Sequence, residues 1–519
     1  MAVTAHRIAR RTLLKSVAVG AVLVGAGHLA ACGSSQPKPQ GYEGERRDLP
    51  IPPLDQGEMV DGVRVFHLDA GEHQVNILPD KTSTAWGFNG GHLGPTLYMR
   101  RGDKVQMHVH NGLDTMTTIH WHGMKLPAKS DGGPHSRIDP GETWSPEWTV
   151  EQPAAMLWYH PHPHMETELH AYRGLAGGIV IADEQADKID LPHDYGVDDI
   201  PVVVMDQKFN EDGSLNEDID PDLGMKGDTP TVNGITAPRF QATTRRLRLR
   251  ILDAATMRFF NFAFSDGREF QLVATDSGLL DKPVTLTELR VSPGERNEIV
   301  VELKPGETVM FKAVPFSESM DVPQDEYALD FGLQDTFDLL EIAAADELSE
   351  PAGPVPEVLN PQAARLPEVA GAPQREFALN TFEINGRTMD MSRVDLAIDH
   401  DGPEVWTVTN ENTDWIHNFH IHNSSFRILE VTGTDVPVPT QGWRDTVQLP
   451  PNATAKLAVV FGQYPDPEWA YMYHCHMLLH EDSGMMGQFV MVRPGEEPKL
   501  NPVAYSHGLH EDHQAAGRR

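Results

Sequence analysis

One short segment near the C-terminal end limits what this chain can fold into more than any other: His474-Cys475-His476, followed by His480 and Met485. A thiolate, imidazoles and a thioether are the ligand set of a blue-copper electron-transfer site. Cys475, His480, a histidine from elsewhere and an axial Met485 would complete such a site. Successive side chains of an extended segment point to opposite faces. We therefore expect an extended segment in which Cys475 faces one metal site while His474 and His476 face another.

Histidines recur at a spacing of two residues far more often than chance allows. The chain holds 25 histidines among 519 residues, and random placement would give roughly one such pair. The sequence contains six of them: His108/His110, His120/His122, His160/His162, His162/His164, His420/His422 and His474/His476. His417 is out of phase with His420 and His422, so it can supply the third imidazole of the Cys475 site.

Four of these pairs supply eight imidazoles, which is enough for three more copper ions, because imidazole is a good copper ligand. The four pairs are His120/His122, His160/His162, His420/His422 and His474/His476. For any single histidine, a surface position or a hydrogen-bonded core position is the simpler reading. The set as a whole indicates copper.

Four motifs carry a resemblance to a known family: HWHG at 120–123, WYHPHPH at 158–164, HNFHIH at 417–422 and HCHMLLHEDSGMM at 474–486. They resemble the four signature segments of bacterial three-domain multicopper oxidases, the branch that contains laccase-like, bilirubin-oxidase-like and cuprous-oxidase-like enzymes. All four occur in order, and no ligand position is substituted. The resemblance covers most of the chain.

The resemblance implies four copper ions: one of type 1, one of type 2 and a type 3 pair. It places the type 1 copper on His417, Cys475, His480 and axial Met485. It places the type 2 copper on His120 and His420. It places one type 3 copper on His122, His160 and His476, and the other on His162, His422 and His474.

Two acidic residues next to these motifs are candidate proton donors. Asp131 lies nine residues after His122, and Glu481 directly follows His480. The resemblance implies that acids at these positions deliver protons to oxygen. Cys475 is expected to conduct electrons from one metal site to the other. Reduction of O2 to two waters consumes four protons, so positioned acids are chemically required. The alternative is that each is an ordinary turn or surface acid.

The first 35 residues are typical of a targeting segment and are excluded from the fold prediction. Arg10-Arg11 belongs to a twin-arginine signal, and residues 29–32 (Leu-Ala-Ala-Cys) resemble a lipobox. We expect export by the twin-arginine route and a periplasmic or cell-surface lipoprotein, anchored to the membrane only through Cys32. The alternative is a plain cleavable signal in which Cys32 is incidental. The other cysteine is Cys475, so we expect no disulfide.

The formal net charge is −34. Such a surface repels phosphate backbones, so we expect no nucleic-acid partner. The expected partners are O2 and a small reducing substrate, and we expect a monomer. Histidines outside the ligand set have simpler explanations. His108 and His110 fit a satisfied core or surface role, His164 fits a local hydrogen bond, and those after residue 500 fit a disordered tail.

Three blocks of similar pattern indicate an internal repeat. Residues 105–111, 247–253 and 405–410 each have a strand pattern, and nine or ten residues later come segments 120–122, 262–264 and 420–422. Short apolar runs separated by turn residues predict an all-β fold of sandwich type. The resemblance makes each copy a cupredoxin-type Greek-key β-sandwich. Phenylalanines replace histidines in the middle copy, which predicts an apolar spacer domain without metal.

The expected organisation is therefore three consecutive cupredoxin domains behind a signal. The predicted bounds are 1–35 for the signal with its lipobox, 46–186 for the first domain, 188–345 for the second, 346–373 for a Pro-rich linker, 374–495 for the third and 496–519 for a polar, histidine-containing tail. Since the first and third domains both supply histidines, we expect the three-copper cluster at their interface.

The function expected from these motifs is a laccase-like oxidation of phenols or aromatic amines coupled to O2 reduction. A metallo-oxidase acting on Cu(I), Fe(II) or Mn(II) is the second hypothesis. Asp414 would suit it, but Trp415 stands where a methionine is expected, and only Met389 and Met391 lie upstream in this domain. A non-catalytic cupredoxin lipoprotein is the third hypothesis.

Overall fold

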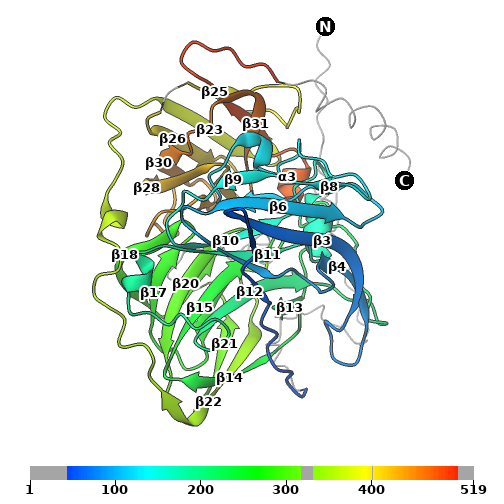
Figure 1. The fold of residues 1–519 in the computed structure, drawn as a ribbon, viewed down its shortest axis with the longest axis vertical. Helices are drawn as coiled ribbons and strands as arrows, with labels where there is room; N and C mark the ends of the chain where they lie inside the picture. Colours follow the sequence, from blue (N-terminus) through cyan, green and yellow to red (C-terminus); the bar gives the residue numbers. More distant parts are fainter. Residues whose placement is uncertain (1–43, 317–330, 400, 501–519) are drawn as a thin grey trace, which may run out of the picture. The chain divides into compact units, whose positions relative to one another are not determined.

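The protein is described here from a computed structural model, which describes residues 44–316, 331–399 and 401–500. Strands dominate these residues, and six sheets pair face to face into three sandwiches that follow one another along the chain. Figure 1 shows the first in blue and cyan, the second in green and the third in yellow to red. This confirms the predicted all-β fold of three consecutive cupredoxin-type sandwiches. The predicted targeting segment (residues 1–35) and the part of the predicted tail after residue 500 lie outside the described residues.

The first sandwich pairs a sheet of order β1-β5-β11-β10-β7 with a sheet of order β2-β3-β6-β8, to which β4 and β9 add. Its strands are β1 (Leu54–Asp55), β2 (Glu58–Val60), β3 (Val63–Val75), β4 (Ser83–Phe88), β5 (Thr96–Arg100), β6 (Lys104–Asn111), β7 (His120–His122), β8 (Thr143–Trp144), β9 (Glu147–Thr149), β10 (Ala155–His160) and β11 (Gly177–Ala182). Its helical turns are η2 (Ala128–Ser130), α1 (Thr167–Tyr172) and η3 (Ala186–Lys188).

The second sandwich pairs a sheet of order β13-β12-β15-β20-β17-β18 with one of order β14-β22-β21-β16-β19. Its strands are β12 (Asp199–Gln207), β13 (Thr229–Val232), β14 (Arg239–Thr244), β15 (Arg246–Asp253), β16 (Phe260–Phe264), β17 (Phe270–Thr275), β18 (Gly278–Leu286), β19 (Glu288–Val291), β20 (Arg296–Glu302), β21 (Thr308–Ala313) and β22 (Phe337–Ser349).

The third sandwich pairs a sheet of order β24-β23-β26-β30-β28 with one of order β25-β32-β31-β27-β29. Its elements are β23 (Gln374–Asn380), β24 (Glu383–Ile384), β25 (Leu396–Ile398), β26 (Glu404–Asn410), β27 (His417–Ile421), β28 (Ser424–Thr432), β29 (Thr446–Leu449), β30 (Thr454–Phe461), β31 (Asp466–His474), the short helix α3 (Leu478–Asp482) and β32 (Met486–Met491). The 3-10 turn η5 (Pro361–Ala364) precedes it.

Alternation of buried and exposed side chains explains why these segments form half-buried strands. In β6, the valines and Met107 are buried while the polar residues between them are more exposed, which is the period of two expected for a strand with one face on a core. Each sandwich has its own apolar core. Phe262 and Phe264 of the middle copy lie in its core, as the spacer interpretation expects.

The structure corrects two of the predicted domain bounds. The predicted linker begins at 346, but β22 continues to Ser349, because Ser349 pairs with Thr244 of β14 and its carbonyl accepts the N–H of Arg245. The first domain was expected from 46, but Leu49 lies in the core of the second sandwich and bonds to Arg239. The prolines and alanines of the predicted linker gave no indication that β22 continues into it. An extended N-terminal segment has no sequence pattern that indicates which sheet it will join.

The rest of the predicted linker is fixed to the second sandwich. The backbone N–H groups of Leu359 and Asn360 donate to the carbonyls of Asp281 and Leu280 in β18. The Leu359 side chain is buried in the core of that sandwich.

Within the described residues, no helix is long and apolar enough to cross a membrane.

Candidate metal centre

Two pairs of neighbouring strands bring the paired histidines into register. In the first sandwich, β7 runs antiparallel to β10, with His120 opposite His160. In the third, β27 runs antiparallel to β31, with His420 opposite His474. His120 and His122 share a face of β7. In the other three motifs the second histidine lies just beyond the strand end, with its ring centroid within 6.0 Å of the first. Each sandwich thus presents a compact set of imidazoles at a strand end.

The two sets meet in one buried cluster. The His120 ring stacks on His422 and the His122 ring stacks on His420, each with ring centroids 3.8 Å apart. His474 lies 4.9 Å from His162, and His476 lies 4.9 Å from His122, measured between ring centroids. The eight histidines are at most 1% exposed: His120, His122, His160, His162, His420, His422, His474 and His476. The predicted convergence of first and third domains is therefore observed.

Nitrogen atoms left without a partner show that the cluster fits a metal. His120 Nε2, His122 Nδ1, His160 Nε2 and His420 Nε2 are buried without a hydrogen-bond partner, and so are both ring nitrogens of His476. Buried polar atoms normally find partners, so a cluster of such orphans is a site for a ligand. Donor atoms of three sets lie within 4.8 Å of one another: His120/His420/His422, His120/His122/His160 and His162/His422/His474.

A separate group of donors surrounds Cys475. Its Sγ lies 3.6 Å from His417 Nδ1 and 3.5 Å from His480 Nδ1, and those two nitrogens are 3.1 Å apart. All three residues are 0% exposed. One thiolate and two imidazole nitrogens at these distances fit a trigonal blue-copper site. The second nitrogen of His417 contacts Asn412 Oδ1 at 2.9 Å, which orients its ring.

The segment between the two groups turns its side chains to two sides, although the strand β31 ends at His474 and does not continue through His476 as expected. β31 ends at His474, whose ring belongs to the cluster, while the Cys475 side chain belongs to the other group. The side chain of Asn418 braces this segment, since its Oδ1 accepts the backbone N–H of His476 at 2.7 Å. A few covalent bonds of the main chain therefore connect the thiol to both neighbouring imidazoles.

The two methionines after this segment face different cores. Met485 is 0% exposed and lies in the same apolar cluster as Cys475. Met486 lies in another cluster, with Met472 and Val490. This packing supports Met485 over its neighbour as the predicted axial ligand.

A change at the axial position should shift the type 1 potential. We expect Met485→Leu to raise the reduction potential, because loss of a thioether donor destabilises oxidised copper more than reduced copper. Redox titration of the blue band measures it, and Met486→Leu is the matched control, expected to leave the potential unchanged. A shift in the control alone would move the axial role to Met486.

Both predicted acids contact cluster histidines. Asp131 Oδ2 lies 2.7 Å from His422 Nδ1, and the Asp131 carbonyl lies 2.9 Å from His120 Nδ1. Glu481 Oε1 lies 3.1 Å from His162 Nδ1, and its Oε2 lies 3.1 Å from His474 Nδ1. Both acids are 1% exposed. Each therefore links one histidine of the first sandwich with one of the third.

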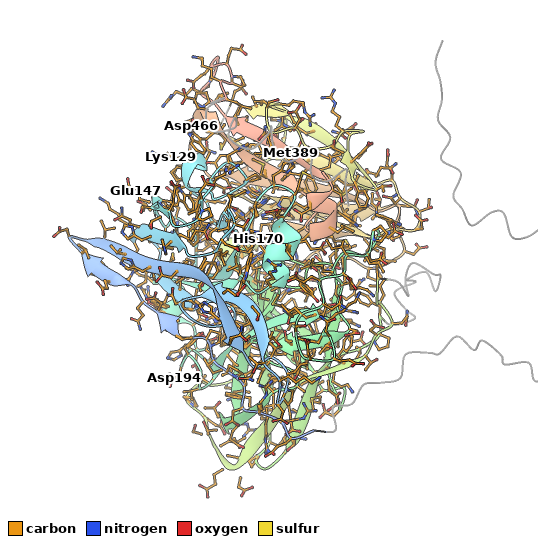
Figure 2. All side chains as sticks on the ribbon, turned by 90° about the vertical axis from the view of Figure 1, so that its right-hand side faces the viewer. Lys129, Glu147, His170, Asp194, Met389 and Asp466 are labelled. Carbon is orange, nitrogen blue, oxygen red and sulfur yellow. The ribbon has the colours of Figure 1, made fainter. Side chains whose placement is uncertain are left out.

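Short helices hold Glu481 in place. Glu481 belongs to α3, and Thr167 at the start of α1 donates from its hydroxyl to Glu481 Oε1 at 2.8 Å. The backbone N–H of Thr167 donates to Asp482. Figure 2 shows α1 near the centre of the view, where His170 is labelled. The two helices thus join the first and third sandwiches beside the cluster.

Burial favours the neutral form of His417, His480 and His122 and the protonated form of the Cys475 thiol when no metal is bound. Burial lowers the pKa of His417 to about 3, and it lowers the pKa of His480 and of His122 well below the ordinary value of 6.5. Burial raises the pKa of the Cys475 thiol to about 12. Neutral imidazole is the ligand form, so the histidines are ready for metal, while Cys475 must release a proton when it binds.

The copper-free protein should lose stability in acid. Burial depresses the pKa of His417 and of His135, the latter to about 4, so the unfolded chain binds more protons than the folded chain below pH 6.5. Stability is complete above 6.5 and falls as the pH drops towards the folded-state values, by up to about 1.4 kcal/mol per pH unit for each imidazole. Thermal unfolding of the copper-free protein from pH 8 to about 4 measures this, and a flat profile would contradict it.

Sequence reasoning missed Asp445 and Arg296. Asp445 Oδ1 lies 3.1 Å from His122 Nε2, and the Asp445 carbonyl lies 2.8 Å from His420 Nδ1. Arg296 of the middle sandwich pairs with this carboxylate. Neither residue lies within a histidine motif, so no local pattern could have found them. The middle sandwich is therefore more than an apolar spacer, although no metal-ligating group among the described residues includes one of its side chains.

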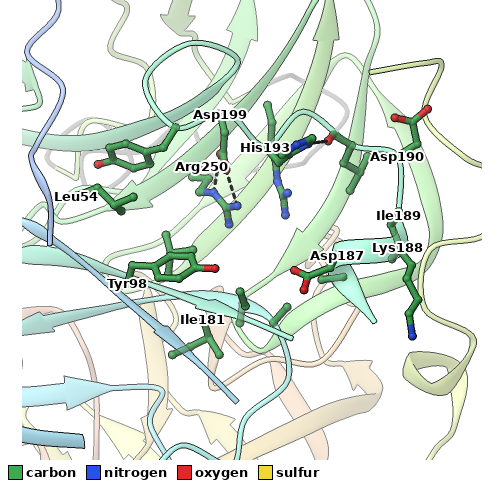
Figure 3. Close-up of a pocket in the computed structure, with 18 residues that line it drawn as sticks. Leu54, Tyr98, Ile181, Asp187, Lys188, Ile189, Asp190, His193, Asp199 and Arg250 are labelled. Carbon is green, nitrogen blue, oxygen red and sulfur yellow. Dashed lines mark hydrogen bonds and ion pairs between the residues drawn. The ribbon is translucent and has the colours of Figure 1, made fainter. Parts of the chain in front are cut away.

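Other histidines lie away from these groups. His108 Nδ1 contacts Ser145 Oγ at 2.8 Å and His110 Nδ1 contacts Thr143 Oγ1 at 3.3 Å, in agreement with the simpler reading. A cavity of about 610 Å³ lies between the first two sandwiches, and Figure 3 shows Arg250 and Asp199 paired in its wall. That cavity contains no residue of the metal-ligating groups.

Comparison with known proteins agrees with this geometry. Two models described as multicopper oxidase match residues 69–186 and 359–495. The multicopper oxidase mco of Staphylococcus haemolyticus is 33% identical, over 82% of this chain and 88% of that protein. The cell division protein FtsP of Yersinia pestis is 32% identical, over 90% and 97%.

Solved structures have the same fold. The laccase-like multi-copper oxidase CueO of Ochrobactrum sp. is 33% identical, with a TM-score of 0.76 over 86% of this chain and 100% of that one. That enzyme is described as having oxidase activity towards lignin model compounds and lignosulfonate. The fold, the buried groups of metal donors and the similar proteins all indicate the same family. This chain belongs to the multicopper oxidase family of O2-reducing oxidoreductases.

Proposed function

We propose that the chain is a laccase-like oxidase that takes single electrons from a small phenol or aromatic amine and reduces O2 to water. The observation that carries this proposal is the complete donor set. His417, Cys475 and His480 form one group, and the histidine cluster forms another, joined through the main chain around Cys475. No expected donor is replaced.

The copper assignment is part of the proposal. His417, Cys475, His480 and axial Met485 would hold the type 1 ion, and the eight cluster histidines would hold the type 2 ion and the type 3 pair, as the family resemblance implies. Bound there, copper would supply the one-electron redox chemistry that couples oxidation of the donor to four-electron reduction of O2. The protein supplies the geometry, the exclusion of water and the protons.

Asp131 and Glu481 would supply protons for the reduction of O2. Asp131 and Glu481 each contact a histidine from both copper-bearing sandwiches and are shielded from solvent. A carboxylic acid at these atoms can donate a proton to oxygen reduced nearby and recover it from solvent. We assign both as proton donors, one on each side of the cluster.

Aromatic rings beside the type 1 group support an aromatic substrate. The Trp415 indole stacks on the His480 ring with centroids 5.3 Å apart and planes 17° apart, and Phe382 packs edge-on to His480 at 5.5 Å. His480 is 0% exposed, whereas Trp415 is 8% exposed. A donor ring that stacks on Trp415 would lie one aromatic layer from His480.

The metallo-oxidase alternative lacks an equivalent feature among the described residues. A soft metal ion such as Cu(I) is best held by thioether sulfur. Met389 packs with Met472 and Met486, in a different apolar cluster from Cys475 and Trp415. Figure 2 shows Met389 in the third sandwich. We therefore favour an organic donor over a metal ion, and the complete donor set favours an oxidase over a non-catalytic role.

The proposal includes the route and the state of the protein. We propose export by the twin-arginine system, a lipid anchor at Cys32 and a monomer at the cell surface or in the periplasm. Mass spectrometry of the mature protein tests the anchor. An unmodified N-terminus downstream of Cys32 would show a plain cleavable signal instead.

Copper content and donor oxidation together test the function. We expect four copper ions per chain by elemental analysis, and four electrons taken from the donor per O2 consumed. A panel of phenols, aromatic amines, bilirubin, Cu(I), Fe(II) and Mn(II), each with oxygen uptake recorded, identifies the donor class. Faster turnover of a metal ion than of every organic donor would favour the metallo-oxidase. Absence of O2 uptake with all donors by the copper-loaded protein would leave the non-catalytic hypothesis.

A further inference from the structure

We propose that the middle sandwich completes the histidine cluster: Arg296 holds Asp445 against His122 and His420 and is a positioning residue for the copper ions. This inference rests on the proposed function, because it concerns how the cluster holds copper. It assigns a role to a domain whose own histidine positions are filled by phenylalanine.

The guanidinium of Arg296 grips Asp445 with two parallel hydrogen bonds. Arg296 Nη1 donates to Asp445 Oδ1 at 2.8 Å, and Nη2 donates to Oδ2 at 2.5 Å. Both residues are 0% exposed. Two-pronged arginine–carboxylate pairs fix orientation as well as charge. Arg296 therefore fixes the position of the Asp445 carboxylate relative to β20, the strand that begins with Arg296.

The remaining donors of Arg296 tie this pair to the other sandwiches. Its Nε donates to the Met156 carbonyl of β10 in the first sandwich at 3.2 Å. Its Nη1 and Nη2 also donate to the carbonyls of Gly294 and Asp276 in the second sandwich. Asp445 precedes β29 of the third sandwich. One buried guanidinium thus joins all three sandwiches at the cluster.

Asp445 in turn sets the tautomers of two cluster histidines. Its Oδ1 lies 3.1 Å from His122 Nε2, and its carbonyl lies 2.8 Å from His420 Nδ1. An acceptor at these positions requires the ring nitrogens to carry protons. The opposite nitrogens, His122 Nδ1 and His420 Nε2, are then lone-pair donors, and these are two of the atoms without a partner. His122 comes from the first sandwich and His420 from the third.

The backbone beside the ion pair leaves no space for a side chain at Gly123. Gly123 follows His122 with φ at +85°, and a Cβ there would lie 2.8 Å from both Arg296 Nη2 and Asp445 Oδ2. A side chain at this position would displace the ion pair. The turn after β7 is therefore built around the contact between Arg296 and Asp445.

Further charges balance the pair within the protein. Arg444 Nη1 lies 2.6 Å from Glu295 Oε1, and the backbone N–H of Arg296 donates to Asp276. Arg444, Glu295 and Asp276 are at most 1% exposed. Without Arg296, the Asp445 carboxylate would be buried with too little compensating charge, which is costly. It would then be free to leave His122.

A buried ion pair can also serve stability alone, and a matched control separates the two roles. Arg250 of β15 makes the same two-pronged contact with buried Asp199, at 2.6 Å and 2.7 Å, in the same sandwich. No cluster histidine contacts that pair in the described structure. Each of Arg296→Lys and Arg250→Lys removes a two-pronged contact with a buried carboxylate, and only the first should affect copper.

The experiment is competition of copper-loaded protein with a graded chelator. Retained copper is measured by elemental analysis, type 1 copper by the blue band, and folding by thermal unfolding. For Arg296→Lys we expect an unchanged blue band and copper of the histidine cluster held about 10- to 100-fold more weakly than in the wild type. Asp445→Asn should show the same loss, and Arg250→Lys should retain cluster copper like the wild type.

Each other outcome has one meaning. Equal copper retention in Arg296→Lys and Arg250→Lys would overturn the inference and leave Arg296 as a structural contact between domains. If Arg296→Lys does not fold, Asp445→Asn decides by the same measurement. A wild-type protein with no copper beyond the blue site would instead refute the proposed function.

Discussion

We expect Cys475→Ser to abolish the blue absorption band and to stop the oxidation of every donor. The thiol is 0% exposed and lies within 3.6 Å of both His417 Nδ1 and His480 Nδ1. Only a thiolate gives the covalent copper–sulfur bond behind the intense band, and a hydroxyl of similar size does not replace it. Because the proposed function makes the Cys475 group the entry for electrons, we expect the loss to extend to all organic donors.

The measurement is the visible spectrum of the copper-loaded variant, together with oxygen uptake. The cluster histidines are untouched, so the variant should retain three copper ions per chain. Met472→Leu is the matched control, since it changes a buried residue of β31, the strand that ends directly before Cys475, with little change of volume and should stay blue. Blue colour that persists in Cys475→Ser would show that the ligand assignment is wrong.

Asp131→Asn separates the two halves of the reaction. The substitution keeps the shape of the side chain next to His422 Nδ1, 2.7 Å away, but removes the group that can hold and release a proton. The type 1 site lies elsewhere, so anaerobic reduction of the blue band by a donor should keep its wild-type rate. Reoxidation by O2 should slow on the order of 100-fold, as expected for loss of a general acid.

Stopped-flow traces at the blue band measure both rates. Asp199→Asn is the matched control, because Asp199 is equally buried but pairs with Arg250 at the cavity shown in Figure 3. It should leave both rates unchanged. Slow reduction with wild-type reoxidation in Asp131→Asn would assign Asp131 to substrate binding instead.

The sequence by itself determined which side chains can hold metal and which share a face. His120/His122 and His474/His476 have the i,i+2 spacing that an extended strand converts into neighbours, and this needs no tertiary information. The phase of His417 against His420 likewise separated the two groups. Three repeats of a strand and turn pattern predicted three sandwiches. Such a pattern can be recognised from the sequence because it depends only on residues close together in the chain.

Only the tertiary structure decided what lies between domains. Arg296 and Asp445 are 149 positions apart in the chain, and their contact exists because three separately formed cores pack against each other. The same holds for the Asp131 contact with His422, 291 positions away, and for Trp415 stacked on His480. Local spacing sets the face on which a side chain lies. Its partner across a domain interface depends on the packing of surfaces whose sequences carry no common period.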